Sequence, residues 1–140
     1  MLFAIGFVCL VAIGTVTHVM VLESGAYRMG HDTYYVIDHF RIWMVLSAMF
    51  PLFSGWYYCF PKVTGRAYSE RLGRLHFWLL FIGFNMTFFP WLFIWLGAML
   101  LPNTVETDAF ALWNQVSSAG VIIWGLGMIV FFYCMLRAFR

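Results

Sequence analysis

Four long apolar runs, separated by short polar segments, make up most of this 140-residue chain. They cover residues 2–22, 34–60, 75–101 and 110–139. An α-helix rises about 1.5 Å per residue and bilayer hydrocarbon is about 30 Å thick, so about 20 apolar residues can cross it. The runs are apolar on every side, whereas the strands of a membrane barrel alternate polar and apolar residues. We therefore predict an all-α membrane protein whose four transmembrane helices form a single domain over residues 1–140.

The composition agrees with a membrane protein and excludes an ordinary soluble domain. Hydrophobic residues make up 64% of the chain and charged residues 10%, whereas soluble domains are about half apolar and about one quarter charged. The net charge of +2 is too small to favour a nucleic-acid partner. Cys9, Cys59 and Cys134 lie far apart within apolar runs, so we expect small buried hydrophobes rather than a disulfide or a metal cluster.

Basic residues predict the orientation of the chain in the membrane. The segment between the second and third runs, together with the C-terminal end, holds six of the eight basic residues: Lys62, Arg66, Arg71, Arg74, Arg137 and Arg140. The loops expected on the other face hold only Arg28, and Arg41 lies within the second run. Segments rich in lysine and arginine stay on the inner side of a membrane. Both termini are therefore expected to face the cytoplasm or the mitochondrial matrix.

Polar residues gather at the outer end of the second run. His39 offers an imidazole that could bind haem iron or a metal, and the alternative is a buried histidine held by hydrogen bonds. His31 and Asp32 at the water boundary could hold a divalent cation; the alternative is a solvated helix start capped by Asp32. His18 and His76 are expected at the membrane interfaces without an assigned role.

Asp38 and Arg41 form a second feature of the same segment. They stand three residues apart, so on a helix they lie on neighbouring positions of one face. Ionisable groups are costly at membrane depth, and a carboxylate and a guanidinium can neutralise each other there. We predict that these two residues form a structural ion pair.

Small residues and a proline indicate how the helices pack. Glycines on the first and last runs would let another helix approach closely; they are Gly6, Gly14, Gly120, Gly125 and Gly127. Pro90 removes a backbone donor and predicts a kink in the third run. Thr87 and Asn85, about one turn earlier, are expected to bond to the carbonyl that the proline frees.

Four segments together resemble a known family. They read HDTYYVIDHF (31–40), FSGWYYCFPKVTG (53–65), LGRLHFWLLFIGFNMTFFP (72–90) and DAFALWNQVSSAG (108–120). In this order and at this spacing they resemble the last four helices of subunit I of haem-copper cytochrome c oxidases, over nearly the whole chain. In that family, subunit I reduces dioxygen at a high-spin haem paired with a copper and fed by a low-spin haem. The resemblance implies a bacterial cytoplasmic membrane or the mitochondrial inner membrane.

The resemblance also implies roles for particular residues. It makes His39 the proximal ligand of the high-spin haem, and it puts His31 with Asp32 at an outer magnesium or manganese site near the haem propionates. In the family, the copper ligands and the cross-linked tyrosine belong to earlier helices. No copper ligand is therefore expected among these 140 residues.

One departure from the family falls on a haem ligand. The family reads Ala-His-Phe-His where this chain reads Asp38-His39-Phe40-Arg41, so arginine replaces the histidine that binds low-spin haem. A guanidinium stays charged and has no free lone pair, so it cannot bind iron. Low-spin haem is therefore not expected here, and Asp38 supplies a counter-charge for the new cation.

A second departure follows Pro90. The family has Gln-His there, and then a Gly-Met-Pro-Arg-Arg turn whose arginines hold haem propionates. This chain has Trp91-Leu92 and, later, the run AMLLP over residues 98–102. Both propionate-binding arginines are therefore absent from the matching positions, although the helix-packing segments are kept.

Three functions remain open at this point. The first is a non-catalytic packing or accessory subunit of a respiratory oxidase-type complex. The second is the C-terminal piece of a split subunit I that takes part in oxygen reduction through haem bound by His39. The third is a small haem-binding protein that uses His39 alone or with a second copy of the chain. The expected partners are the bilayer and either other membrane subunits or the chain itself, and catalysis by this chain alone is not expected.

Overall fold

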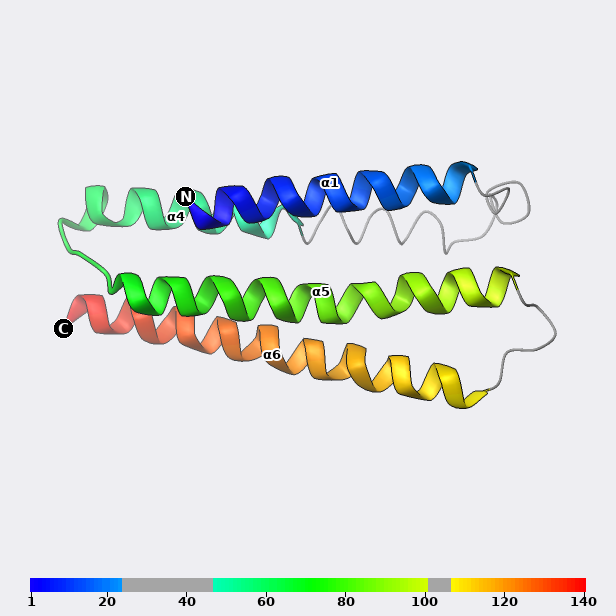
Figure 1. Ribbon diagram of the computed structural model, residues 1–140. Coiled ribbons are helices and arrows are strands. Elements are labelled where there is room, and N and C mark those ends of the chain that lie inside the picture. The colour runs from blue at the N-terminus through cyan, green and yellow to red at the C-terminus, as the bar shows by residue number, and fades with distance from the viewer. Residues whose placement is uncertain (24–46, 101–106) are drawn as a thin grey trace. The chain divides into compact units, whose positions relative to one another are not determined.

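A computed structural model describes residues 1–23, 47–100 and 107–140. Within these ranges the chain is helical and contains no strand. The helices, shown in Figure 1, are α1 (Leu2–Glu23), α4 (Met49–Thr64), α5 (Glu70–Leu100) and α6 (Thr107–Phe139). The all-α class is therefore confirmed.

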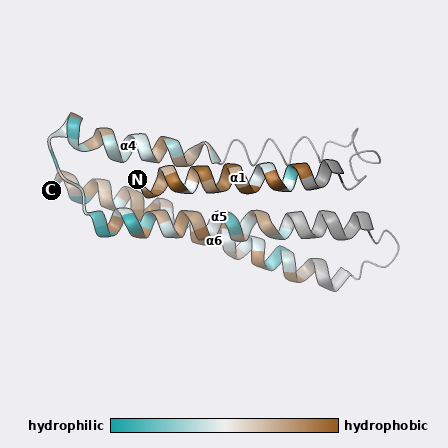
Figure 2. Ribbon diagram, turned by 45° about the horizontal axis from the view of Figure 1, so that its top comes forward, coloured by the Kyte–Doolittle hydropathy of each residue, from teal (hydrophilic) through white to brown (hydrophobic). Residues whose placement is uncertain are grey.

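Three of the described helices are long and apolar enough to cross a membrane. Their apolar stretches are Leu2–Val19, Glu70–Pro90 and Ala111–Phe139. The predicted second span, 34–60, is described only from residue 47 onward. Figure 2 shows α1 as predominantly hydrophobic, with polar residues at the beginning of α5.

Helix α4 runs beyond the predicted end of its span, through Pro61 to Thr64. Gly65 then adopts a left-handed conformation with φ of 66°, and its N–H donates to the carbonyl oxygen of Pro61 at 3.0 Å. Glycine takes this conformation without the steric cost of a Cβ atom, so it is the usual residue at such helix ends. Lys62 in the last turn also favours the negative end of the helix dipole.

The described chain divides into two compact units, Met1–Gly65 and Arg66–Arg140. In the first unit, aromatic rings join α1 to α4. The ring of Phe3 stacks on Tyr57 at a centroid distance of 5.4 Å and also packs against Phe50 at 6.0 Å and Phe53 at 5.7 Å. That all four helices form one transmembrane domain stays a prediction.

The second unit is an antiparallel pair of long helices, α5 and α6. Residues later in α6 contact residues earlier in α5. Gly120 lies against Thr87, and Phe131 lies against His76. Phe139, at the end of α6, contacts Arg66 in the segment before α5. Large apolar side chains are exposed on both helices, as the surface of a membrane helix requires. They include Trp78 and Ile82 on α5, and Leu126, Ile129 and Tyr133 on α6.

Helix α5 continues through Pro90 as one element. Thr87 and Asn85, which were expected to bond to the carbonyl freed by Pro90, bond to other carbonyls. Thr87 Oγ1 donates to the carbonyl of Gly83 at 2.8 Å, and Asn85 Nδ2 donates to that of Phe81 at 2.7 Å. The expectation was wrong because helical side chains point toward the N-terminus and reach the carbonyl four residues before their own.

Candidate functional site

The five site residues predicted from the sequence all lie outside the described residues. They belong to the segment 24–46 and are His31, Asp32, Asp38, His39 and Arg41. Their proposed haem, metal and ion-pair roles therefore stay predictions. Among the residues that the structure describes, no group of three or more histidine, cysteine or acidic side chains could hold a metal ion.

The best-defined site in the described chain is the seam between α5 and α6. We call Gly83, Thr87, Ser117 and Gly120 the glycine seam. A Cβ atom on Gly83 would lie 2.5 Å from the backbone nitrogen of Trp124 and 2.8 Å from the carbonyl oxygen of Gly120. A Cβ on Gly120 would lie 2.6 Å from the backbone nitrogen of Thr87. The two backbones can therefore approach this closely only because neither glycine has a side chain.

Hydrogen bonds link the two helices along the glycine seam. The hydroxyl of Ser117 donates to the carbonyl oxygen of Thr87 at 2.9 Å, which joins α6 to α5. Thr87 in turn donates its own hydroxyl to Gly83 within α5. Both hydroxyl side chains are buried, so their polar groups are satisfied inside the protein and not by water.

The sequence predicted part of this packing. Gly120 lies at the closest approach, and a Cβ on Gly127 would lie 3.2 Å from Leu79, so both were placed correctly at helix contacts. Gly125 differs, because nothing lies within 4 Å of a Cβ built on it. The main partner, Gly83, was not among the predicted packing residues.

His76 makes a packing contact that the sequence did not indicate. It is fully buried, and its ring lies 5.3 Å from that of Phe131; its expected depth at the membrane interface stays a prediction. The signal that could have found it is spacing. His76, Leu80, Gly83 and Thr87 follow one another by four, three and four residues, which is the spacing of one helix face, and all four are buried.

The end of α6 contacts the segment just before α5. The thiol of Cys134 donates to the carbonyl oxygen of Ser69 at 3.9 Å, and Cys134 is buried as expected. Cys9 and Cys59 are exposed instead, because they lie on outer faces of α1 and α4.

Burial raises the pKa of the Tyr68 hydroxyl above its ordinary value of 10.0, and Glu70 adds to the rise. Tyr68 therefore stays neutral at physiological pH.

We predict that Ser117→Ala lowers the free energy of unfolding by about 0.5–1.5 kcal/mol, because it removes a hydrogen bond between two helices. Ser118→Ala is the matched control. Ser118 is exposed and donates only to Asn114 of its own helix, at 2.8 Å, so its loss should change stability by less than about 0.5 kcal/mol. Unfolding by a denaturing detergent in mixed micelles measures both. Equal effects would show that the bond from Ser117 to Thr87 does not stabilise the pair.

The sequence is similar to known proteins along nearly its whole length. Residues 1–123 match the family described as Cytochrome C and Quinol oxidase polypeptide I. The chain is similar to cytochrome c oxidase subunit 1 of Yarrowia lipolytica, with 46% identity over 132 residues, or 94% of this chain. It is also similar to cytochrome c oxidase subunit 1 of Cereibacter sphaeroides, with 40% identity over 144 residues that cover 100% of this chain. The chain spans 25% of the length of each of these relatives.

Proposed function

From the premise that this chain belongs to the cytochrome c and quinol oxidase polypeptide I family, we propose that it is a non-catalytic membrane subunit. In this proposal it packs against other subunits of a respiratory oxidase-type complex. The family and the apolar helices make the chain an integral membrane protein. Its relatives are named as subunits of cytochrome c oxidase, so membrane partners of that type are the natural expectation.

The observation that carries this proposal is the arginine at position 41. The resemblance implies a histidine there as a ligand of low-spin haem, and a guanidinium has no lone pair to give to iron. Asp38, three residues earlier, replaces an alanine of the family and supplies a carboxylate to the new cation. A pair of opposite charges in place of a haem ligand favours a structural role for this segment.

The α5–α6 pair supports the same proposal. Trp91 and Leu92 follow Pro90 where the family has glutamine and histidine, and no arginine pair stands near residues 98–102. The glycine seam, in contrast, holds the two helices in backbone contact. Residues expected to support haem have changed while those that fix helix packing are present.

The alternative is the C-terminal piece of a split subunit I, and the retention of His39, His31 and Asp32 favours it. A neutral imidazole suits a single axial bond to high-spin haem iron, so His39 fits that group. An imidazole and a carboxylate are suitable but incomplete ligands for magnesium or manganese. In this alternative the haem would supply the oxygen-reducing chemistry, and His39 would hold it. The low-spin haem does not fit, because Arg41 leaves its iron one ligand short.

The proposal includes an orientation. Six of the eight basic residues lie in the segment 62–74 and at the C-terminal end, which favours the cytoplasm or the mitochondrial matrix for both termini. The membrane would then be the bacterial cytoplasmic membrane or the mitochondrial inner membrane.

Absorption spectroscopy on the purified chain and its co-purifying partners distinguishes the two functions. We expect a chain that is colourless when separated from its partners, and unchanged assembly of the complex in His39→Ala. His18→Ala is the matched control, since that histidine has no assigned role. A Soret band that weakens in His39→Ala but not in His18→Ala would favour the split-subunit function. Absence of any other oxidase-like chain from the extract would contradict both functions. A Soret band from such an extract would then indicate a small haem-binding protein.

A further inference from the structure

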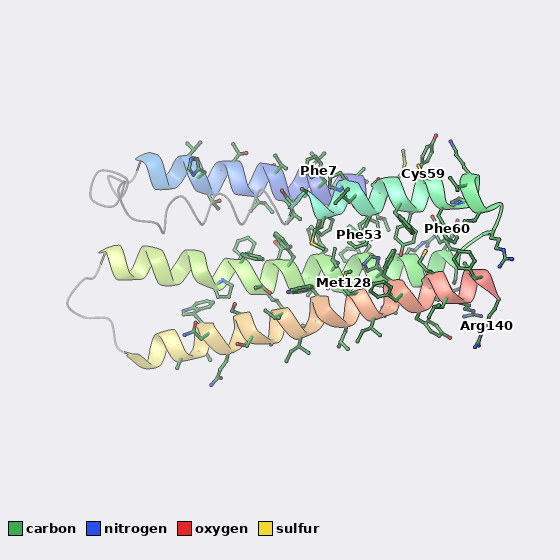
Figure 3. The ribbon with its side chains drawn as sticks, turned by 180° about the vertical axis from the view of Figure 1, so that it is seen from behind. Phe7, Phe53, Cys59, Phe60, Met128 and Arg140 are labelled. Atoms are coloured by element: carbon green, nitrogen blue, oxygen red, sulfur yellow. The ribbon has the colours of Figure 1, made fainter. Side chains whose placement is uncertain are left out.

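The C-terminal end of α6 needs partners from outside its own helix. The last four carbonyl groups of an α-helix have no later N–H group of that helix to bond with. Helix α6 ends at Phe139, and Figure 3 shows Arg140 at that end. A helix end opens more easily than the interior of a helix. The residues that contact this end therefore decide how firmly it stays closed.

Arg66, in the segment before α5, contacts this end of α6 in two ways. Its guanidinium donates a hydrogen bond to the carbonyl oxygen of Phe139. Its Cζ atom also lies 5.5 Å from the centroid of the Phe139 ring, a distance at which a cation and an aromatic face attract each other. A positive charge suits the negative end of a helix dipole as well. One side chain thus closes the last turn of α6.

A second contact holds the same segment to α6. The thiol of Cys134, which is fully buried, donates to the carbonyl oxygen of Ser69 at 3.9 Å. That carbonyl oxygen also accepts the N–H of Gly73, in the first turn of α5, at 3.0 Å. Ser69 is therefore bonded both to α6 and to the beginning of α5. We call residues 66–69 the strap.

The strap is non-helical, so its position depends on its contacts with other elements. We propose that the strap and the last turn of α6 form one conformational device, which Arg66 keeps closed. When the contact between Arg66 and Phe139 breaks, the last turn of α6 opens and Ser69 separates from Cys134. The two events are coupled because both contacts fall within one short segment, and such segments open as cooperative units. A change at the end of α6 thus reaches the beginning of α5.

The rate at which a water-soluble maleimide labels Cys134 tests the proposal on the full chain in detergent micelles. Cys9 and Cys59 are exposed and are first changed to serine, which leaves Cys134 as the single thiol of the chain. Labelling then requires the device to open, because Cys134 is fully buried. We expect Arg66→Gln to be labelled about fivefold faster. That factor corresponds to about 1 kcal/mol, the upper value for a cation at an exposed helix end.

Arg71→Gln is the matched control, since it removes the same charge from a nearby position. Arg71 is exposed and makes no hydrogen bond or ion pair with the residues that the structure describes, so its labelling rate should match that of the unmodified strap. Arg66→Lys keeps a charged donor and should be labelled more slowly than Arg66→Gln. An unchanged rate in Arg66→Gln, or an equal increase in Arg71→Gln, would overturn the proposal.

Hydrogen exchange resolved by residue distinguishes a coupled device from a simple helix cap. The N–H of Gly73 reports on the strap, because its hydrogen-bond acceptor is the carbonyl of Ser69. In Arg66→Gln we expect this amide and the amides of residues 136–139 to exchange faster by the same factor, and in Arg71→Gln neither should change. Faster exchange at 136–139 with Gly73 unchanged would show that Arg66 caps α6 without controlling the strap, which contradicts the proposal.

Discussion

Gly83→Ala is expected to lower the free energy of unfolding by about 2–3 kcal/mol, the upper part of the range for overpacked sites. The added methyl group would lie 2.5 Å from the backbone nitrogen of Trp124 and 2.8 Å from the carbonyl of Gly120. Neither obstacle can rotate away, since both belong to the main chain of α6. The helices must separate, and the hydrogen bond from Ser117 to Thr87 would lengthen with them.

Gly125→Ala is the matched control on the same helix pair. Nothing lies within 4 Å of a Cβ atom at Gly125, and alanine is the better helix former, so stability should stay the same or rise slightly. Titration with a denaturing detergent in mixed micelles, followed by circular dichroism, compares the two variants. Equal destabilisation by both would mean that backbone contact at Gly83 does not hold α5 to α6.

Arg41→Ala and Asp38→Ala, each made alone, are expected to lower the free energy of unfolding by about 3–5 kcal/mol. Each change leaves one charge without its counter-charge at a depth where ionised groups are costly. The double variant Asp38→Ala with Arg41→His returns the segment to the pattern of the family and should cost less than either single change.

A double-mutant cycle measures the coupling between these two residues. Unfolding free energies of the unmodified chain, Asp38→Ala, Arg41→Ala and the double variant Asp38→Ala/Arg41→Ala give the interaction energy directly. We expect strong coupling, because the two changes relieve each other. Additive effects would contradict the ion pair and with it the idea that Asp38 compensates for Arg41.

The sequence predicted the class of the fold well because the bilayer imposes the length and composition of each span. Helix ends were predicted less well. Helix α5 begins at Glu70, before the apolar run does, because Glu70 suits the positive end of the helix dipole and pairs with Arg74. Helix α4 extends to Thr64, and the left-handed Gly65 that follows ends it. Hydropathy detects the part of a helix in hydrocarbon and not its polar continuation.

The sequence indicated which residues lie at helix contacts better than it indicated which residues they face. Gly120 was expected at a helix contact, but only the structure shows that it faces Gly83 and Thr87. A sequence indicates which residues share a helix face, but the rotation of one helix against another depends on both surfaces together. His76 illustrates the same difficulty, since its expected depth in the membrane did not indicate that its ring packs against Phe131.

The haem-related residues were inferred from the resemblance together with the chemistry of each side chain. Composition and spacing alone left His39 open between a ligand and a buried histidine. The family comparison supports the resemblance over residues 1–123, which include position 41. The role of the segment 31–41 lies outside the described residues and stays a prediction.

The most direct test of the account is an experimental density map of the intact complex that resolves haem ligands around position 41. We expect the guanidinium of Arg41 to lie against the carboxylate of Asp38, with no low-spin haem iron bound in that pocket. A six-coordinate haem iron in the same pocket, with another group supplying the missing bond, would contradict the account.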